Sequence, residues 1–151
     1  MKYRRNVGLG EALASQMAEF VRSLPWDLDM MVPVPLGKSR LKERGYNQVA
    51  LVAQPLAYYA NLLYASEALW KSRDTRSQVG LNISQRRENV QHAYKADPAI
   101  VKHKSILLMD DVATTGSTIA SCTEALLSAE ARDVYAITIA RALSHHSLNR
   151  V

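Results

Sequence analysis

An apolar run, Ser105–Met109, leads directly into two adjacent aspartates, Asp110 and Asp111. A near-continuous apolar segment of this length is typical of a central parallel strand that is covered on both faces. Small and hydroxylated residues follow, and the helical pattern of 117–129 begins immediately after them. Strand, tight turn and helix in this order predict an α/β protein with an open, mostly parallel, twisted sheet and flanking helices.

The N-terminal third contains a helix and a strand. Apolar residues recur at spacings of three and four over 9–23, which predicts a helix with one buried stripe that ends at Pro25. The run Met30–Val34 has the length of a strand. Because Pro33 has no backbone donor, we expect this strand to lie near a sheet edge, or Pro33 to lie where the strand leaves the sheet.

Residues 35–46 are rich in Lys and Arg and close with Gly45, which predicts a basic loop. Asn47 is a good N-cap for a helix that continues to about Asn61. Pro55 lies inside this helix and should bend it.

The second half holds further short strands and one long loop. Residues 72–84 have no apolar face to bury, so we expect them to be the most mobile internal segment, followed by a short helix from Ser84 to Val90. Further strands are predicted at 62–64, 68–70, 93–96 and 134–140. No linker or repeat divides the sequence, so we treat 1–151 as a single domain.

Composition places limits on the environment of the chain. Hydrophobic residues make up 48% and charged residues 22%, the balance of an ordinary soluble globular protein. No apolar run approaches the ~20 residues of a membrane span. The single cysteine, Cys122, excludes an intrachain disulfide and is consistent with a reducing compartment, so a cytoplasmic location is expected.

The formal charge of +5 is concentrated in two basic clusters, one within 38–44 and one within 71–87. Clusters of this kind favour a polyanionic ligand, either a phosphorylated small molecule or a nucleic acid, although a solvated basic face explains them equally well. Few aromatic residues lie between the basic ones, so we expect single-stranded DNA binding to be weak.

The turn after the aspartates has the chemistry of a sugar-phosphate site. Backbone amides and hydroxyls at a helix N-terminus suit a monoester phosphate, and the candidate 5′-phosphate ligands are Ala113, Thr114, Thr115, Gly116, Ser117 and Thr118. Asp110 and Asp111 can accept hydrogen bonds from ribose hydroxyls and can bind Mg²⁺, either directly or through water. The plainer alternative is an acidic strand end followed by a well-capped helix.

The whole segment Ile106–Thr118 resembles the PRPP-binding signature of type I phosphoribosyltransferases. A wider resemblance is to the ComF family of phosphoribosyltransferase-like competence proteins, carried by Val32–Leu36, Arg40–Gln48, Arg76–Gln78, Arg86–Val90 and Ala140-Arg141. Members of that family typically carry an N-terminal zinc module, which this sequence lacks. The resemblance implies a type I phosphoribosyltransferase fold, a PRPP or related phosphoribosyl ligand, Mg²⁺, and a link to competence and DNA uptake with a competence helicase and other DNA-processing proteins.

The resemblance also suggests roles for basic residues. Arg40 and Arg44 could meet the pyrophosphate, or could lock their loop onto the following helix. The residues Gln78, Arg86, Arg87 and Asn89 flank the segment that closes over the reacting bond in phosphoribosyltransferases. A solvated basic helix explains Arg86 or Arg87 equally well.

Three functions remain open: a phosphoribosyl-binding protein, an active transferase with an unidentified nitrogen acceptor, and a single-stranded nucleic acid binder. Purine salvage enzymes carry an aspartate where this signature has Thr114, and a threonine cannot act as a carboxylate base. A purine salvage role is therefore disfavoured, and no catalytic residue is assigned.

Overall fold

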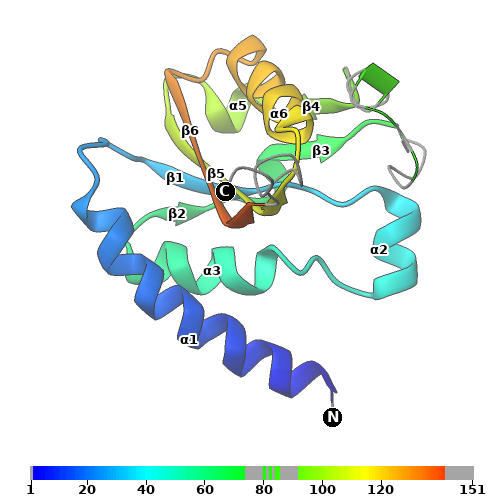
Figure 1. Ribbon diagram of the computed structural model, residues 1–151. Helices are drawn as coiled ribbons and strands as arrows, with labels where there is room; N and C mark the ends of the chain where they lie inside the picture. The colour runs from blue at the N-terminus through cyan, green and yellow to red at the C-terminus, as the bar shows by residue number, and fades with distance from the viewer. Residues whose placement is uncertain (1, 74–79, 81, 83, 86–91, 142–151) are drawn as a thin grey trace, which may run out of the picture.

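The computed structural model describes residues 2–73, 80, 82, 84–85 and 92–141. Its main sheet has four parallel strands in the order β2-β1-β5-β6 (Figure 1). β5 pairs with β1 on one side and with β6 on the other, which confirms the prediction that the apolar run forms a central parallel strand. The strands are β1 (Met30–Pro33), β2 (Leu63–Tyr64), β5 (Ser105–Ala113) and β6 (Asp133–Arg141).

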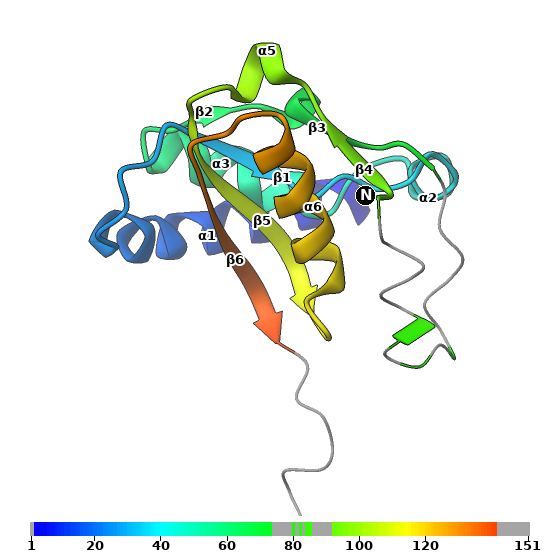
Figure 2. The same ribbon diagram turned by 90° about the horizontal axis from the view of Figure 1, so that it is seen from above.

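Helices cover both faces of this sheet, because successive side chains of β5 point to opposite sides. Leu107 and Met109 pack in one cluster beneath α1 (Lys2–Ser23) and α3 (Ala50–Tyr59). Ile106 and Leu108 pack in a second cluster on the other face, with α6 (Ser117–Ser128). Figure 2 shows β5 and β6 running side by side toward the same end, with α6 alongside them.

A small antiparallel ribbon completes the second face. β3 (Leu69–Lys71) pairs with β4 (Tyr94–Ala96) in a sheet of their own, and the buried residues Leu69 and Tyr94 join the cluster beneath α6. The 3₁₀ turn η1 (Ser66–Ala68) precedes the ribbon, and the short helix α5 (Pro98–Val101) follows it, capped by the Asp97 carboxylate on the Ala99 amide.

The first helix packs closely against α3 at Gly10. A Cβ atom placed on Gly10 would lie 2.7 Å from the carbonyl oxygen of Leu51, a backbone atom of α3. The same atom placed on Gly8, two residues earlier in the same helix, would meet nothing within 4 Å. The close approach of α1 to α3 therefore requires a glycine at position 10 but not at position 8.

We expect alanine at these two positions to have opposite effects on the free energy of unfolding. Gly10→Ala forces α1 away from α3 and should lower that free energy by ~1–3 kcal/mol. Gly8→Ala removes a flexible residue from an open helical position and should raise it by up to about 1 kcal/mol. Urea unfolding of both variants tests this, and equal midpoints for the two would contradict the described packing.

Two sequence predictions near the first strand need correction. The expected loop at 35–46 contains a helix, α2 (Lys38–Arg44), which ends at Gly45 in the left-handed conformation. None of its residues is buried, so it has no apolar stripe from which the sequence could predict it. Asn47 is not the N-cap of α3, a position that Val49 occupies. Its side chain instead accepts from the Val49 amide at 3.1 Å and donates to the Val34 carbonyl at 3.0 Å.

The strands predicted at 62–64, 68–70, 93–96 and 134–140 correspond to β2, β3, β4 and β6. The first helix begins at Lys2 rather than at residue 9, and α3 ends at Tyr59. Pro55 lies inside α3, and its bending of the helix stays a prediction.

Pro33 is the last residue of β1, so it lies where the strand leaves the sheet rather than at a sheet edge. Most of the predicted mobile loop, 74–79 with 81 and 83, lies outside the described residues, as does most of the helix predicted after Ser84. No helix in the described part of the chain is long and apolar enough to cross a membrane.

Candidate functional site

The site forms where β5 continues beyond its neighbour β1. Their pairing ends at Pro33 and Met109, and the amide of Val34 donates to the Met109 carbonyl at 2.8 Å. From Asp110 to Ala113, β5 pairs only with β6. Asp110 and Asp111 therefore lie within a strand that is longer than predicted, at the carboxyl end of the sheet where open α/β folds bind ligands.

Asp110 is a buried carboxylate with 9% of its surface exposed. Its Oδ1 accepts a hydrogen bond from the Asp111 amide at 2.8 Å. Burial raises the pKa of Asp110 to about 6, and the neighbouring Asp111 charge makes a smaller contribution in the same direction. The hydrogen bond from the Asp111 amide acts in the opposite direction. A carboxylate that is buried despite the free-energy cost of its charge, at the carboxyl end of an open parallel sheet, is a candidate for ligand contact.

Asp111 is half-buried, and its Oδ1 accepts from the Val112 amide at 2.7 Å. Each of the two carboxylates thus uses one oxygen on the backbone, and a carboxylate has a second oxygen that can accept. Magnesium is commonly bound by one or two carboxylates together with waters and substrate phosphates. The pair fits that pattern, and among the described residues no group of three or more His, Cys, Asp or Glu side chains gathers to hold a metal on its own.

The turn between β5 and α6 brings the predicted phosphate ligands together. Gly116, the N-cap of α6, has a φ of 77°, a left-handed conformation that glycine adopts without strain. The hydroxyls of Thr115 and Ser117 lie 2.7 Å apart, and the Ser117 amide donates to Thr115 Oγ1 at 3.3 Å. Ala113 ends the strand, Thr114 is exposed and Thr118 lies in the first turn of α6, where helix amides lack intrahelical partners.

Three residues that the sequence analysis did not assign to the site also lie here. Burial raises the pKa of the Tyr94 phenol in β4, with smaller contributions from Cys122 and Asp110, whereas the nearby Thr118 side chain acts in the opposite direction. Lys71 Nζ lies 5.7 Å from the centre of the Tyr94 ring. Burial raises the pKa of the Cys122 thiol, with a further contribution from Asp110. Tyr94 and Lys71 come from segments distant from 106–118 in the sequence, so no spacing signal could have found them, whereas Cys122 lies within α6.

The basic candidates have different positions. Arg40 of α2 lies close enough to Tyr94 for its charge to lower the pKa of the phenol, although burial outweighs it. Arg44 donates from Nη1 to Gln48 Oε1 at 3.0 Å, a contact that favours the locking role over a ligand role. The pyrophosphate role of both arginines stays a prediction. The other loop candidates, Gln78, Arg86, Arg87 and Asn89, lie outside the described residues.

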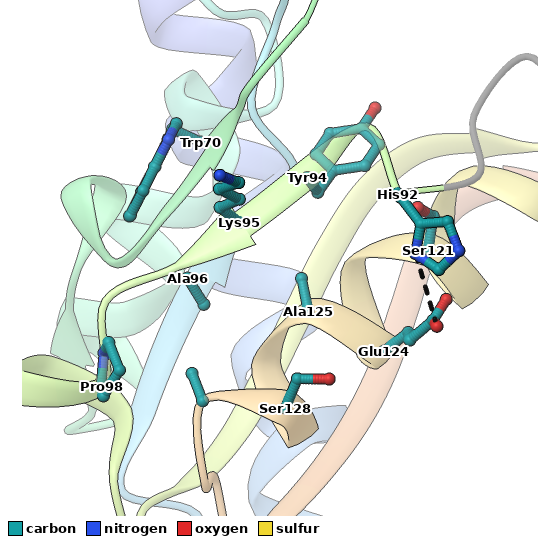
Figure 3. Close-up of a pocket in the computed structure, with 11 residues that line it drawn as sticks. Trp70, His92, Tyr94, Lys95, Ala96, Pro98, Ser121, Glu124, Ala125 and Ser128 are labelled. Carbon is teal, nitrogen blue, oxygen red and sulfur yellow. Dashed lines mark ion pairs between the residues drawn. The ribbon is translucent and has the colours of Figure 1, made fainter.

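A pocket of about 340 Å³ lies between β4 and α6 (Figure 3). It extends past Ala125 to Ser128 at the far end of α6, about 16 Å along the helix from Ser117. His92 Nδ1 and a Glu124 carboxylate oxygen, 3.7 Å apart, form an ion pair at its rim. In Figure 3 the Tyr94 hydroxyl points away from the Pro98 and Ser128 end. The lining residues of the pocket come from β3, β4 and α6 and their flanks and do not include 110–118, so the pocket lies beside the predicted site rather than within it.

Curated relatives resemble this chain over most of its length. The DNA utilization protein YhgH of Escherichia coli strain K12 is 35% identical over 115 residues, which cover 76% of this chain and 50% of the relative. YhgH of Salmonella typhimurium is 32% identical over 148 residues, 95% of this chain and 65% of the relative. Competence protein F of Haemophilus influenzae is 30% identical over 118 residues, which cover 76% of this chain and 51% of the relative. The chain spans about half the length of the first of these relatives, and no family model matches it.

Solved structures share the fold at low sequence identity. Glutamine PRPP amidotransferase from B. subtilis, complexed with ADP and GMP, is 18% identical with a TM-score of 0.60, over 90% of this chain and 27% of that chain. Phosphoribosylpyrophosphate synthetase from Mycobacterium smegmatis is 22% identical with a TM-score of 0.52, over 87% of this chain and 34% of that chain. At such identities the likeness establishes the fold.

Proposed function

Because this chain belongs to the ComF family and has the type I phosphoribosyltransferase fold, we propose that it binds PRPP or a related 5′-phosphoribosyl ligand at the carboxyl end of β5. The observation that carries the proposal is the buried Asp110, with its pKa raised to about 6, on the strand that turns directly into the N-terminus of α6. A carboxylate and a helix N-terminus in sequence match the two ends of a ribose 5-phosphate.

Each part of the site has a separate role in this proposal. The amides and hydroxyls of 113–118 hold the 5′-phosphate, and Asp110 and Asp111 accept hydrogen bonds from the ribose hydroxyls. The same carboxylates hold Mg²⁺, directly or through water, and the metal neutralises charge on the pyrophosphate. Arg40 and Lys71, which both lie near Tyr94, supply positive charge at the same edge.

A thermal-shift panel tests this proposal with PRPP, ribose 5-phosphate and nucleoside monophosphates, each with and without Mg²⁺. At about a hundred times its dissociation constant, a ligand stabilises the folded state by ~2.7 kcal/mol. We expect PRPP with Mg²⁺ to give the largest shift of the panel. A panel in which nothing phosphoribosylated shifts the transition at millimolar concentration contradicts the proposal.

Binding, rather than transfer, is the activity that we propose first. Thr114 occupies the position where purine salvage enzymes carry a carboxylate base, and its side chain cannot take a proton near neutral pH. The alternative is an active phosphoribosyltransferase that uses a nitrogen acceptor and releases pyrophosphate. The names of its relatives, a DNA utilization protein and competence protein F, support a proposed role in DNA utilization or competence. A cytoplasmic location, and a competence helicase with other DNA-processing proteins as partners, complete the proposal and rest on the family resemblance.

The exposed helix α2 supports an additional, weak affinity for single-stranded DNA. Its four basic residues are all exposed: Lys38, Arg40, Lys42 and Arg44. Four phosphate contacts predict that the logarithm of the binding constant falls with the logarithm of salt concentration at a slope of about −3. Because Arg40 lies near the phosphoribosyl site, millimolar PRPP should compete in part.

An oligonucleotide titration at low and moderate salt, repeated with PRPP, measures both effects. Replacing Lys38 and Lys42 with alanine should flatten the salt dependence and leave PRPP binding unchanged. Tight oligonucleotide binding that persists at high salt would contradict our proposal that the phosphoribosyl compound is the primary ligand, and would make nucleic acid the primary ligand instead.

A further inference from the structure

The basic helix α2 lies in the loop that connects β1 to α3 (Figure 1). The loop leaves β1 at Val34, whose amide donates to the Met109 carbonyl at 2.8 Å. Met109 directly precedes Asp110, so the loop begins beside the carboxylates rather than beside the turn into α6. It ends at Val49, the N-cap of α3. An anionic group on the β1 side of a bound ribose would therefore approach this loop.

Side-chain packing does not fix the position of α2. None of its residues is buried, so α2 gains little of the tertiary packing that stabilises most helices. Arg44, at its end, donates to Gln48 of the same loop, a contact that does not join the loop to the sheet. The position of α2 relative to β5 therefore depends on how the two ends of its loop are held.

Asn47 joins the two ends of this loop through its side chain. Its Nδ2 donates to the Val34 carbonyl at 3.0 Å, and its Oδ1 accepts from the Val49 amide at 3.1 Å. Val34 is thus held on both sides, by β5 through its amide and by Asn47 through its carbonyl. Val34 and Val49 are buried, so a backbone group left without a partner here would cost free energy.

We propose that Asn47 is a positioning residue of the phosphoribosyl site, which holds α2 so that Arg40 meets the pyrophosphate of PRPP. We assign Arg40 because Arg44 is already engaged with Gln48, and because a guanidinium binds phosphate oxygens in pairs. The inference rests on the proposed function, since it adds a determinant to the same site. The turn into α6 serves the 5′-phosphate, so Asn47 should matter only for ligands that carry a pyrophosphate.

Titrations of two ligands separate positioning from a general structural role, because ribose 5-phosphate lacks the pyrophosphate of PRPP. Asn47→Ala should raise the Kd for PRPP with Mg²⁺ about tenfold and change the Kd for ribose 5-phosphate less than about twofold. Asn47→Ser should do the same, since its hydroxyl still accepts from the amide two residues on but is too short to reach the Val34 carbonyl. In an Arg40→Ala background Asn47→Ala should have little further effect, because both changes remove one contact.

Asp97→Ala is the matched control. Asp97 makes the same kind of bond, to the Ala99 amide at 2.9 Å, as the N-cap of α5, which precedes the start of β5. Its loss should leave both Kd values unchanged, and thermal unfolding without ligand shows which variants are folded. If Asn47→Ala does not fold, Asn47→Ser gives the same test, alone and combined with Arg40→Ala. Equal weakening of both ligands, unchanged PRPP binding, or effects that add in the double variant would overturn the inference. A parent that binds neither ligand would overturn the proposed function and this inference with it.

Discussion

Asp110→Asn is expected to raise the free energy of unfolding at pH 7 by up to about 3 kcal/mol, because one pKa unit corresponds to about 1.36 kcal/mol. The wild-type carboxyl has a pKa of about 6 in the folded chain against an ordinary value of 3.8, and burial is the main cause. At pH 7 the folded chain therefore holds a charge that its surroundings disfavour. Asparagine removes that charge and keeps an oxygen that can accept from the Asp111 amide.

The pH dependence of this gain follows from the direction of the shift. A carboxyl whose pKa is raised by folding favours the folded state while it is protonated, and this contribution is lost as pH rises from about 4 through about 6. The gain in Asp110→Asn should therefore be full at pH 7 and disappear near pH 4. Asp111→Asn is the matched variant, and it should give a smaller gain because the Asp111 charge only adds to the effect of burial. Chemical denaturation from pH 4 to pH 8 measures both, and an Asp110→Asn variant no more stable than the parent at pH 7 contradicts this description of Asp110.

The double variant Asp110→Asn with Asp111→Asn is expected to lose at least a hundredfold in affinity for PRPP in the presence of Mg²⁺. Hydrogen bonds to charged groups contribute ~1.5–3 kcal/mol each, and two carboxylates are changed at once. Asparagine preserves the shape of each side chain but has no charge to offer a metal, and its amide nitrogen donates where the carboxylate accepted. Calorimetric titration of PRPP into parent and variant provides the comparison.

The first prediction serves as the control for the second. If Asp110→Asn stabilises the chain, weaker binding by the double variant cannot come from unfolding. Asp29→Asn is a further control, because Asp29 accepts from the Ser105 amide at 2.8 Å at the opposite end of β5, and its loss should leave PRPP binding intact. Unchanged affinity in the double variant would remove the ribose and metal roles from both aspartates.

Much of the fold could be predicted because its core strand carries an unambiguous pattern. Every residue from Ser105 to Asp110 is buried, as expected of a strand covered on both faces. The first helix could be predicted from the spacing of its large apolar residues, of which Val21 is buried whereas Leu9 and Phe20 are exposed. Its buried side also contains Ala14 and Ala18, which are too small to mark the stripe in the sequence. Gly116, directly before α6, marked the turn between strand and helix. Its φ of 77° is one that most other residues adopt only with strain.

The parts that sequence could not supply have no periodic signal. α2 buries no residue, so no stripe distinguishes it from a loop. Tyr94 and Lys71 reach the site only because β3 and β4 pair in a separate ribbon that packs beneath α6. The sequence indicated that β5 should end near its aspartates, but pairing with β6 carries the strand on to Ala113. These features depend on tertiary packing, which overrides local propensity.

The central claim is that the strand, turn and helix from Ile106 to Thr118 bind a 5′-phosphoribosyl group. Calorimetric titration of PRPP into the parent chain, with Mg²⁺ and then with a chelator, tests it most directly. We predict saturable binding of one PRPP per chain that strengthens with Mg²⁺, and competition by ribose 5-phosphate for the same site. No heat of binding and no thermal stabilisation at millimolar PRPP with Mg²⁺ would contradict the claim.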